Sequence, residues 1–286
     1  MAQRMISRWK LCAMLAGKKI IFGLSLLHVT EEQNIPEVHD VFNAIELPGI
    51  FLNRECEKLQ SLPQEVFFND VLPIGLTREI ALQDQRIQEN FLTELALLLD
   101  RASNVGASGI VVDFEIESCF ADTVRGNATD SLLKRLSADL LRTELRLLLP
   151  IRFPFNPEAE GSSEKYLDCL KKMMSPQIGF VLNVYPHELA GRELDLKKLL
   201  HWIRFDTDLI RFIYEPETGN RLVPRLLKPW LQLVHDFELD VPLMAAPLFE
   251  QRETVEYELL ILNDLFINLT TEQEKEYENA ETWRKC

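Results

Sequence analysis

The sequence has few of the features that mark a secreted, membrane or nucleotide-binding protein. Its five cysteines are an odd number and include no Cys-x-x-Cys pair, so reduced thiols are the simplest interpretation. No apolar run approaches the roughly 20 residues that a membrane-spanning helix needs. The phosphate-binding pattern GxGxxG is absent, and so is GxxxxGK followed by Ser or Thr. We therefore expect a cytoplasmic protein without a membrane partner.

Positive charge is also scarce. The 286 residues include 31 lysines and arginines against 45 aspartates and glutamates, which gives a net charge of −14. A duplex-binding protein needs a basic face, so we expect no nucleic-acid partner. The composition, 47% apolar and 27% charged, is ordinary for a globular protein. The length allows one barrel or two smaller domains, and the oligomeric state stays open.

The stretch Ala107–Glu117, ASGIVVDFEIE, is the strongest lead to a functional site. A strand sends successive side chains to opposite faces, so Asp113, Glu115 and Glu117 share one face with Val111. The apolar face, which begins with Val112, is expected to pack on helices as in other α/β proteins. Three carboxylates on the inner face would repel one another unless a cation, an arginine or water screens them.

Eight strand patterns alternate with helical patterns along the chain. The helical patterns include Asp84–Gly106, Ala128–Thr143, Leu194–Thr207 and Asn220–Leu239, with Gly106 as a stop signal. The predicted strands are Lys19–Leu27, Asn43–Phe51, Glu65–Leu76, Ala107–Glu117, Leu145–Phe155, Ile178–Tyr185, Leu209–Glu215 and Val241–Phe249.

This alternation predicts a single closed (β/α)8 TIM barrel over residues 19–269, because eight βα units in about 250 residues match that fold. An open doubly wound sheet is the alternative, but it would normally carry a glycine-rich phosphate turn. Residues 1–18 are interpreted as an N-terminal arm or helix rather than a signal peptide, because Lys18 and Lys19 interrupt the apolar stretch. Residues 270–286 form a polar C-terminal tail.

Barrel active sites lie at the carboxyl ends of the strands. Several polar side chains map to that rim from separate strands, and this convergence favours a site. The rim residues assigned here are Glu46, Asp113, Glu115, Glu117, Arg152, Asn183, Tyr185, His187, Glu215 and Glu217.

Structural roles compete with these assignments. Glu46 fits a structural ion pair equally well, and the acid strand could pair with Arg152 and Arg211 to hold the core. Arg211 enters its predicted strand early, so we expect it low in the barrel. His187 precedes a helix and fits a solvated loop residue equally well.

The chain resembles the xylose-isomerase-like barrel superfamily of sugar isomerases, sugar-phosphate epimerases and related endonucleases. NAIELPGI resembles the second strand of that superfamily, and the long helix followed by IVVDFE resembles its fourth unit. IGFVLNVYPHELAG resembles its sixth strand. The resemblance covers about 250 residues and implies a divalent metal bound at the ends of strands five to eight.

The residues depart from that metal site. The strand-five glutamate is replaced by Arg152, the strand-six aspartate by Asn183, and the strand-eight glutamate by Ala246 or Pro247. An arginine puts a positive charge where a metal ion would bind, so we expect no cofactor at the usual metal position. A relocated metal site remains an alternative, built from Glu115, Glu117, His187 and Glu215. We expect Arg152 to pair with the strand-four carboxylates instead.

The leading hypothesis is a sugar or sugar-derivative isomerase or epimerase that moves a proton next to a carbonyl. Glu115 or Glu117 would act as the base, His187 would relay a proton, and Arg152 would hold an anionic group or an enolate oxygen. The expected partner is a small polar or anionic molecule. Further substrate-binding roles are assigned to Glu46, Asp113, Asn183, Tyr185, Glu215 and Glu217. The alternatives are a non-catalytic ligand-binding barrel that has lost its metal, and a hydrolase using two carboxylates.

Overall fold

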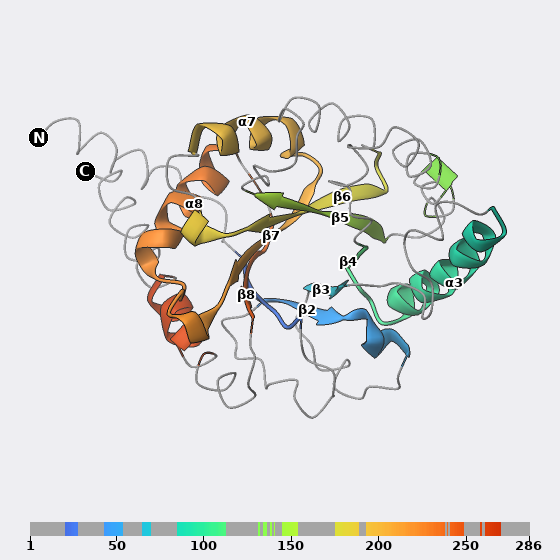
Figure 1. The fold of residues 1–286 in the computed structure, drawn as a ribbon, viewed down its shortest axis with the longest axis horizontal. Coiled ribbons are helices and arrows are strands. Elements are labelled where there is room, and N and C mark those ends of the chain that lie inside the picture. The colour runs from blue at the N-terminus through green and yellow to red at the C-terminus, as the bar shows by residue number, and fades with distance from the viewer. Residues whose placement is uncertain are drawn as a thin grey trace, which may run out of the picture.

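Eight parallel strands close into a barrel in a computed structural model of the chain (Figure 1). The ring closes where β1 pairs with β8, with Phe22 opposite Leu243. The strands are β1 Phe22–Ser25, β2 Ala44–Pro48, β3 Glu65–Asn69, β4 Gly109–Val111, β5 Arg146–Phe153, β6 Ile178–Val184, β7 Thr207–Tyr214 and β8 Leu243–Pro247. The predicted (β/α)8 barrel is therefore confirmed, and the open doubly wound sheet is excluded.

The structure describes only part of the chain. The described residues are 21–27, 43–53, 65–69, 85–112, 131, 134, 135, 138, 140, 145–153, 175–188, 193–237, 239, 241–248, 258 and 261–269. The predicted arm, residues 1–18, and the predicted tail, residues 270–286, lie outside them, so these boundaries stay predictions.

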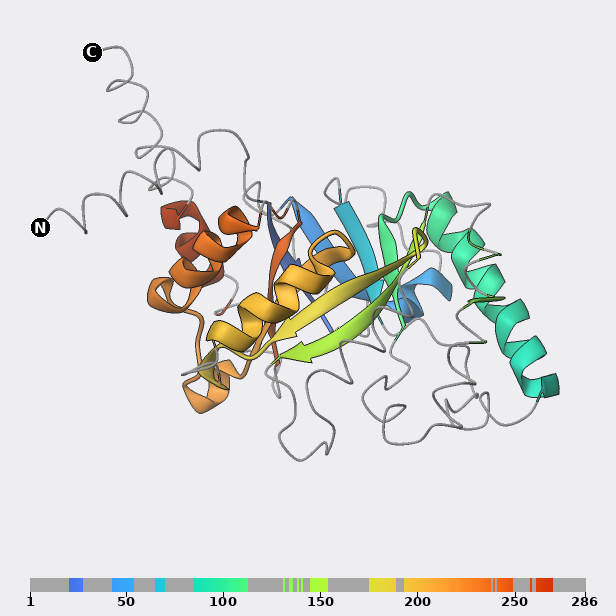
Figure 2. The same ribbon diagram turned by 90° about the horizontal axis from the view of Figure 1, so that it is seen from above.

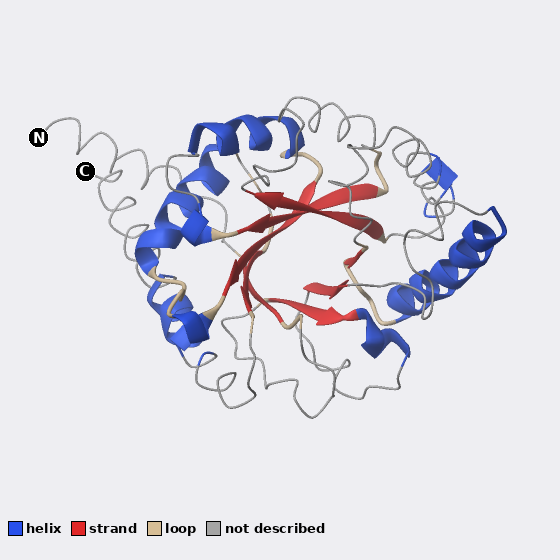
Figure 3. Ribbon diagram, in the orientation of Figure 1, coloured by secondary structure: helices blue, strands red, loops and turns tan. Residues whose placement is uncertain are grey.

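The described helices lie outside the ring of strands (Figures 1 and 3). Turning the molecule shows α7 running alongside β6 and β5 (Figure 2). None of the described helices is long and apolar enough to cross a membrane. The helices are α3 Gln85–Asn104, α7 Glu193–Ile203 and α8 Pro224–Asp236, with short 3-10 helices η2 Gly49–Asn53, η4 Pro186–Glu188 and η5 Pro216–Thr218; residues 261–269 are also helical.

Strand alternation divides the core into an inner and an outer part. On β5, Leu148 faces inward, whereas Leu147 and Leu149 pack outward in the layer that contains the helix residues. The outer layer is the larger of the two, and it includes the buried residues of the described helices. The inner cluster consists of Ala44, Phe67, Val111, Leu148, Val181, Leu209 and Met244. The barrel is thus filled by side chains below its mouth.

The predicted orientation of the acid-rich strand is confirmed where the structure describes it. Val111 belongs to the inner cluster and Val112 to the outer layer. The carboxylates that continue this alternation, Asp113, Glu115 and Glu117, lie outside the described residues.

Several predicted element boundaries were wrong for local reasons. Strand Asn43–Phe51 ends at Pro48, because residues 49–53 turn into η2. Helix Leu194–Thr207 ends at Ile203, where the Thr207 hydroxyl donates to the Ile203 carbonyl at 2.9 Å and Thr207 begins β7. Helix Asn220–Leu239 begins only at Pro224, since proline suits a first helical position that needs no N–H donor.

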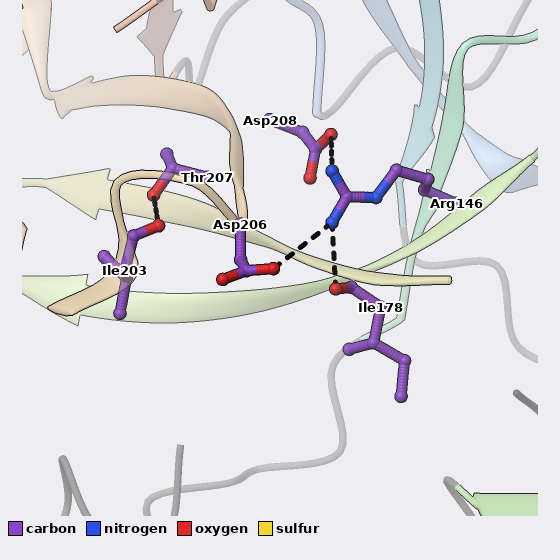
Figure 4. Close-up of polar contacts among 6 residues, drawn as sticks. All are labelled: Arg146, Ile178, Ile203, Asp206, Thr207 and Asp208. Atoms are coloured by element: carbon purple, nitrogen blue, oxygen red, sulfur yellow. Dashed lines mark hydrogen bonds and ion pairs between the residues drawn. The ribbon is translucent and has the colours of Figure 1, made fainter. Parts of the chain in front are cut away.

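The amino ends of β5, β6 and β7 carry a partly buried ion pair (Figure 4). Arg146 donates from Nη1 to Asp208 Oδ1 at 2.7 Å and from Nη2 to the Ile178 carbonyl at 3.0 Å. A register shift between β6 and β7 brings Asp208 against Gly179, where a Cβ atom would lie 1.7 Å from Asp208 Oδ2. Burial raises the pKa of Asp208 to about 6, although Arg146 opposes the shift. Residues at this end of a barrel normally stabilise the fold and do not take part in catalysis.

A second buried acid lies behind the barrel wall. Glu258 is fully buried, and its carboxylate lies 3.1 Å from Arg221 Nε. Burial raises the pKa of Glu258, while Tyr214 and Arg221 oppose that rise. The pKa of Tyr214 is raised well above 10, by burial first and then by the Glu258 carboxylate. This cluster links β7 to the final helix and does not open into the barrel.

Candidate functional site

The candidate site is built on a row of inward-facing residues near the carboxyl ends of β5, β6 and β7. Arg152 pairs in register with Asn183, and Asn183 pairs with Arg211. The neighbours of Asn183, Leu182 and Val184, belong to the outer layer, so the row faces the barrel interior. In this row one asparagine therefore lies between two arginines at the mouth.

Arg152 is held from two sides at the rim. Its guanidinium carbon lies 3.8 Å from the centroid of the Tyr185 ring, which is a cation–π contact. Its Nη2 donates to both carboxylate oxygens of Glu188, at 2.9 and 3.1 Å. The side chains of Arg152 and Glu188 are 36% and 47% exposed, so a ligand can reach this pair from solvent.

The turn after β6 explains this geometry. Pro186 begins η4 directly after Tyr185, and the Glu188 N–H donates to the Tyr185 carbonyl at 3.0 Å. The chain therefore curls back toward β5 and brings Glu188 over Arg152. β6 ends at Val184, so His187 is an exposed residue of this turn and is not positioned by the strand.

A buried ion pair lies below the rim inside the barrel. Arg211 donates from Nη2 to Glu46 Oε1, and the Ser25 hydroxyl donates to Glu46 Oε2. The side chains of Glu46 and Arg211 are 0% and 4% exposed. Their strands, β2 and β7, are separated in the ring by β1 and β8, so the pair spans part of the interior. Two opposite charges satisfy each other where water does not reach.

Arg211 lies higher in the barrel than predicted. The prediction placed it near the start of its strand, but β7 begins two residues earlier, at Thr207. Arg211 is therefore level in register with Asn183, above the inner apolar cluster that contains Leu209.

Two polar atoms in the row lack a hydrogen-bond partner among the described residues. They are Asn183 Oδ1 and Arg211 Nε, and both atoms are buried. Buried polar groups in native proteins are almost always paired, so each of these atoms needs a partner that the described residues do not supply.

The structure brings together some of the predicted site residues and separates others. Arg152, Asn183 and Tyr185 meet at the mouth, and Glu46 lies beneath them in the ion pair. Glu215 and Glu217 are exposed, at the entry to η5 and within it. The described partner of Arg152 is Glu188, whereas the expected partners Asp113, Glu115 and Glu117 lie outside the described residues.

Sequence reasoning assigned no site role to Glu188, Arg211 or Ser25. Glu188 follows His187 directly, but its contact depends on the turn at Pro186. The pairing of Arg211 with Glu46 could have been predicted, because both residues were expected to lie inside the barrel and they carry opposite charges.

The described residues at the positions where the resemblance implies metal ligands are not the usual ligands of a divalent metal. Such an ion needs several converging oxygen or imidazole ligands. The corresponding positions instead hold the guanidinium of Arg152, the amide of Asn183, and Ala246 on β8, with Arg211 beside the amide. Among the described residues, no group of three or more His, Cys, Asp or Glu side chains is arranged to hold a metal.

No family model and no curated protein sequence matches the chain. Solved structures resemble it over most of its length. A D-tagatose 3-epimerase-like protein has a TM-score of 0.63 at 16% identity, covering 89% of this chain and 99% of that one. D-psicose 3-epimerase from Clostridium cellulolyticum H10, solved with D-tagatose, has a TM-score of 0.56 at 12% identity over 93% and 98%. The apo 3-keto-D-glucoside 4-epimerase of E. coli has a TM-score of 0.55 at 12% identity over 94% and 100%.

These likenesses are at the level of the fold. Identities of 10–16% do not carry residue roles from one chain to another. They confirm the architecture expected from the sequence, because the chain has a (β/α)8 barrel fold.

Proposed function

We propose that this barrel binds a sugar or sugar derivative at its mouth and moves a proton on a carbon next to a carbonyl. The observation that carries the proposal is the row Arg152–Asn183–Arg211 at the carboxyl ends of β5 to β7. Barrels of this fold include epimerases of ketoses and of a keto-glucoside. A row of hydrogen-bonding and cationic groups suits a ligand rich in hydroxyl and carbonyl oxygens.

The proposed step balances as a proton transfer. A carboxylate base, Glu115 or Glu117, takes the proton from the carbon, and the electron pair moves onto the carbonyl oxygen as an enolate. Arg152 lies where a guanidinium can hold that oxygen or a neighbouring anionic group. His187 relays the proton, which returns to the same carbon on its other face or to the adjacent carbon. The described residues do not include the proposed bases.

Glu188 sets a condition on this role for Arg152. The two side chains are paired in the free protein, so a ligand oxygen must share Arg152 with Glu188 or displace it. Both groups are partly exposed, and such pairs contribute only about 0–1 kcal/mol to stability. A ligand can therefore displace Glu188 from Arg152 at little cost in stability.

A non-catalytic binding barrel is the second candidate. It is favoured by one observation, the cationic and amide side chains at the positions where the resemblance implies metal ligands. A barrel that keeps hydroxyl-binding groups without a metal could retain affinity and lose turnover.

Proton NMR in D2O separates the two candidates. The protein is incubated with D-tagatose, D-psicose or D-fructose, and the signal of the proton next to the carbonyl is followed. The proposal expects loss of that signal by deuterium exchange, and expects Glu115→Gln with Glu117→Gln to abolish it. Saturable binding without exchange would support the binding barrel, and neither binding nor exchange would reject both.

A further inference from the structure

The two unpartnered atoms of the mouth are complementary to each other. Arg211 Nε carries a hydrogen to donate, and Asn183 Oδ1 accepts one. The residues are register partners on β6 and β7, so their backbones are adjacent and their side chains enter the barrel from neighbouring strands. They nevertheless make no hydrogen bond with each other.

The Arg211 side chain cannot rotate to give its Nε–H another partner without breaking its hydrogen bond to Glu46. Its Nη2 is committed to Glu46, and Glu46 is also held by Ser25. The planar guanidinium therefore keeps Nε–H in a fixed direction, because its donors form a rigid fork. Asn183 is part-buried, with Leu182 and Val184 on its strand anchored in the outer layer.

We propose that Asn183 and Arg211 form a subsite for one hydroxyl group of a polyhydroxylated ligand. The hydroxyl oxygen accepts from Arg211 Nε, and its hydrogen is donated to Asn183 Oδ1. This inference rests on the proposed function and deepens it, because it assigns a neutral hydroxyl to the floor of the mouth beside the exposed Arg152.

Other ligand groups fit this pair less well. A carboxylate can accept from Arg211 but has no hydrogen for Asn183 Oδ1, and an ammonium group cannot accept from Arg211. A divalent cation is repelled by the guanidinium. A hydroxyl both donates and accepts, and it can also serve the amide if the side chain turns to present its NH2 group.

Asn183→Leu tests the subsite through two independent readouts. The change removes the acceptor and replaces the amide with an apolar side chain of similar size on the strand. Asn263→Leu is the matched control, because Asn263 Oδ1 is also buried without a described partner but lies on the final helix. D-tagatose, D-psicose and D-fructose are titrated calorimetrically against wild type and both variants, and thermal unfolding is followed without ligand.

The subsite predicts opposite effects on binding and folding. Asn183→Leu should weaken ketose binding about tenfold or more, because a hydrogen bond shared with a charged donor is lost. Its Tm should stay the same or rise by about 2 °C, because an unpaired acceptor has been removed from the interior. Asn263→Leu should leave affinity unchanged.

Two results would overturn the subsite. One is unchanged affinity in Asn183→Leu. The other is a clear fall in its Tm without ligand, which would show that Asn183 is already paired within the fold. If no ketose binds the wild type, the proposed function fails, and the Tm result alone then decides whether Asn183 is free for a ligand.

Discussion

Charged residues inside this barrel differ in how far water can screen them, and this decides what each contributes. The Arg152–Glu188 pair at the rim is partly exposed, whereas the Arg211–Glu46 pair is closed to solvent. Removing one partner from an exposed pair costs little, but it leaves a bare charge in a buried pair. The arginine–glutamate pair at the rim is therefore open to a ligand, whereas the buried arginine–glutamate pair stabilises the fold.

Substitutions in the two pairs should separate these roles. Glu46→Gln should lower the free energy of unfolding by about 3–5 kcal/mol, because Arg211 then keeps an uncompensated buried charge. Arg152→Gln should lower it by less than about 1 kcal/mol. Chemical denaturation at neutral pH measures both. Equal costs would show that Glu46 reaches water. The Glu46–Arg211 pair would then not be a rigid base for the site.

Asp208 predicts a pH dependence with a definite sign. Burial raises its pKa from 3.8 to about 6, so the folded protein keeps a proton there that the unfolded chain releases. The contribution of Asp208 is therefore most favourable below pH 4 and is lost as the pH rises to about 6. The full effect is about 3 kcal/mol.

Asp208→Asn removes this ionisation and should reveal it by difference. The free energy of unfolding of the variant, relative to wild type, should increase between pH 4 and pH 7. Asp264→Asn on the final helix, an exposed position, controls for the loss of one negative charge. A difference that stays flat over this interval would contradict the raised pKa.

At the scale of elements, the barrel strands were predictable because their signal is local. Residues 147–151 and 178–182 are apolar runs whose burial requires strands covered on both faces. Gly106, with φ of 72°, ends α3 where its pattern placed the stop. The turn at Pro186 and the β6–β7 register shift were not predictable, because they depend on contacts between strands.

The register shift gives Gly179 a specific role. Gly179→Ala would place a Cβ atom 1.7 Å from Asp208 Oδ2, and Arg146 holds that carboxylate in place. We expect a loss of about 1–3 kcal/mol in the free energy of unfolding, as for other overpacked sites.

A double-mutant cycle checks this cause. The cost of Gly179→Ala should fall when Asp208 is also replaced by Ala, because the colliding carboxylate is gone. Additive costs would show that Gly179 is required for another reason, such as the approach of Leu148.

At the scale of the whole molecule, the fold and the end of the barrel that carries the site could be predicted, but the contacts within the site could not. Glu46 and Arg211 are 165 residues apart in sequence, and only closure of the ring brings them together. The Arg152–Glu188 contact depends on a turn that interrupts strand alternation. Arg152 and Asn183, by contrast, lie near the carboxyl ends of β5 and β6, where the sequence placed them.

Metal content tests the whole-molecule account of the mouth. We expect the purified protein to carry no stoichiometric transition metal at the ends of β5, β6 and β8, because guanidinium groups occupy that region. Elemental analysis after purification without chelators measures this. About one metal per chain, with anomalous scattering at that position, would show that the strand motifs have been misaligned.

The most direct test of the central claim is NMR of the arginine side chains during titration with D-tagatose, D-psicose or D-fructose. In protein labelled with 15N-arginine, the Nε–H signals of Arg152 and Arg211 report on the mouth, and that of Arg146 reports on the opposite end of the barrel. The account predicts saturable shifts of the Arg152 and Arg211 signals with little change at Arg146. Binding that leaves both mouth arginines unchanged, or that shifts Arg146 alone, would contradict it.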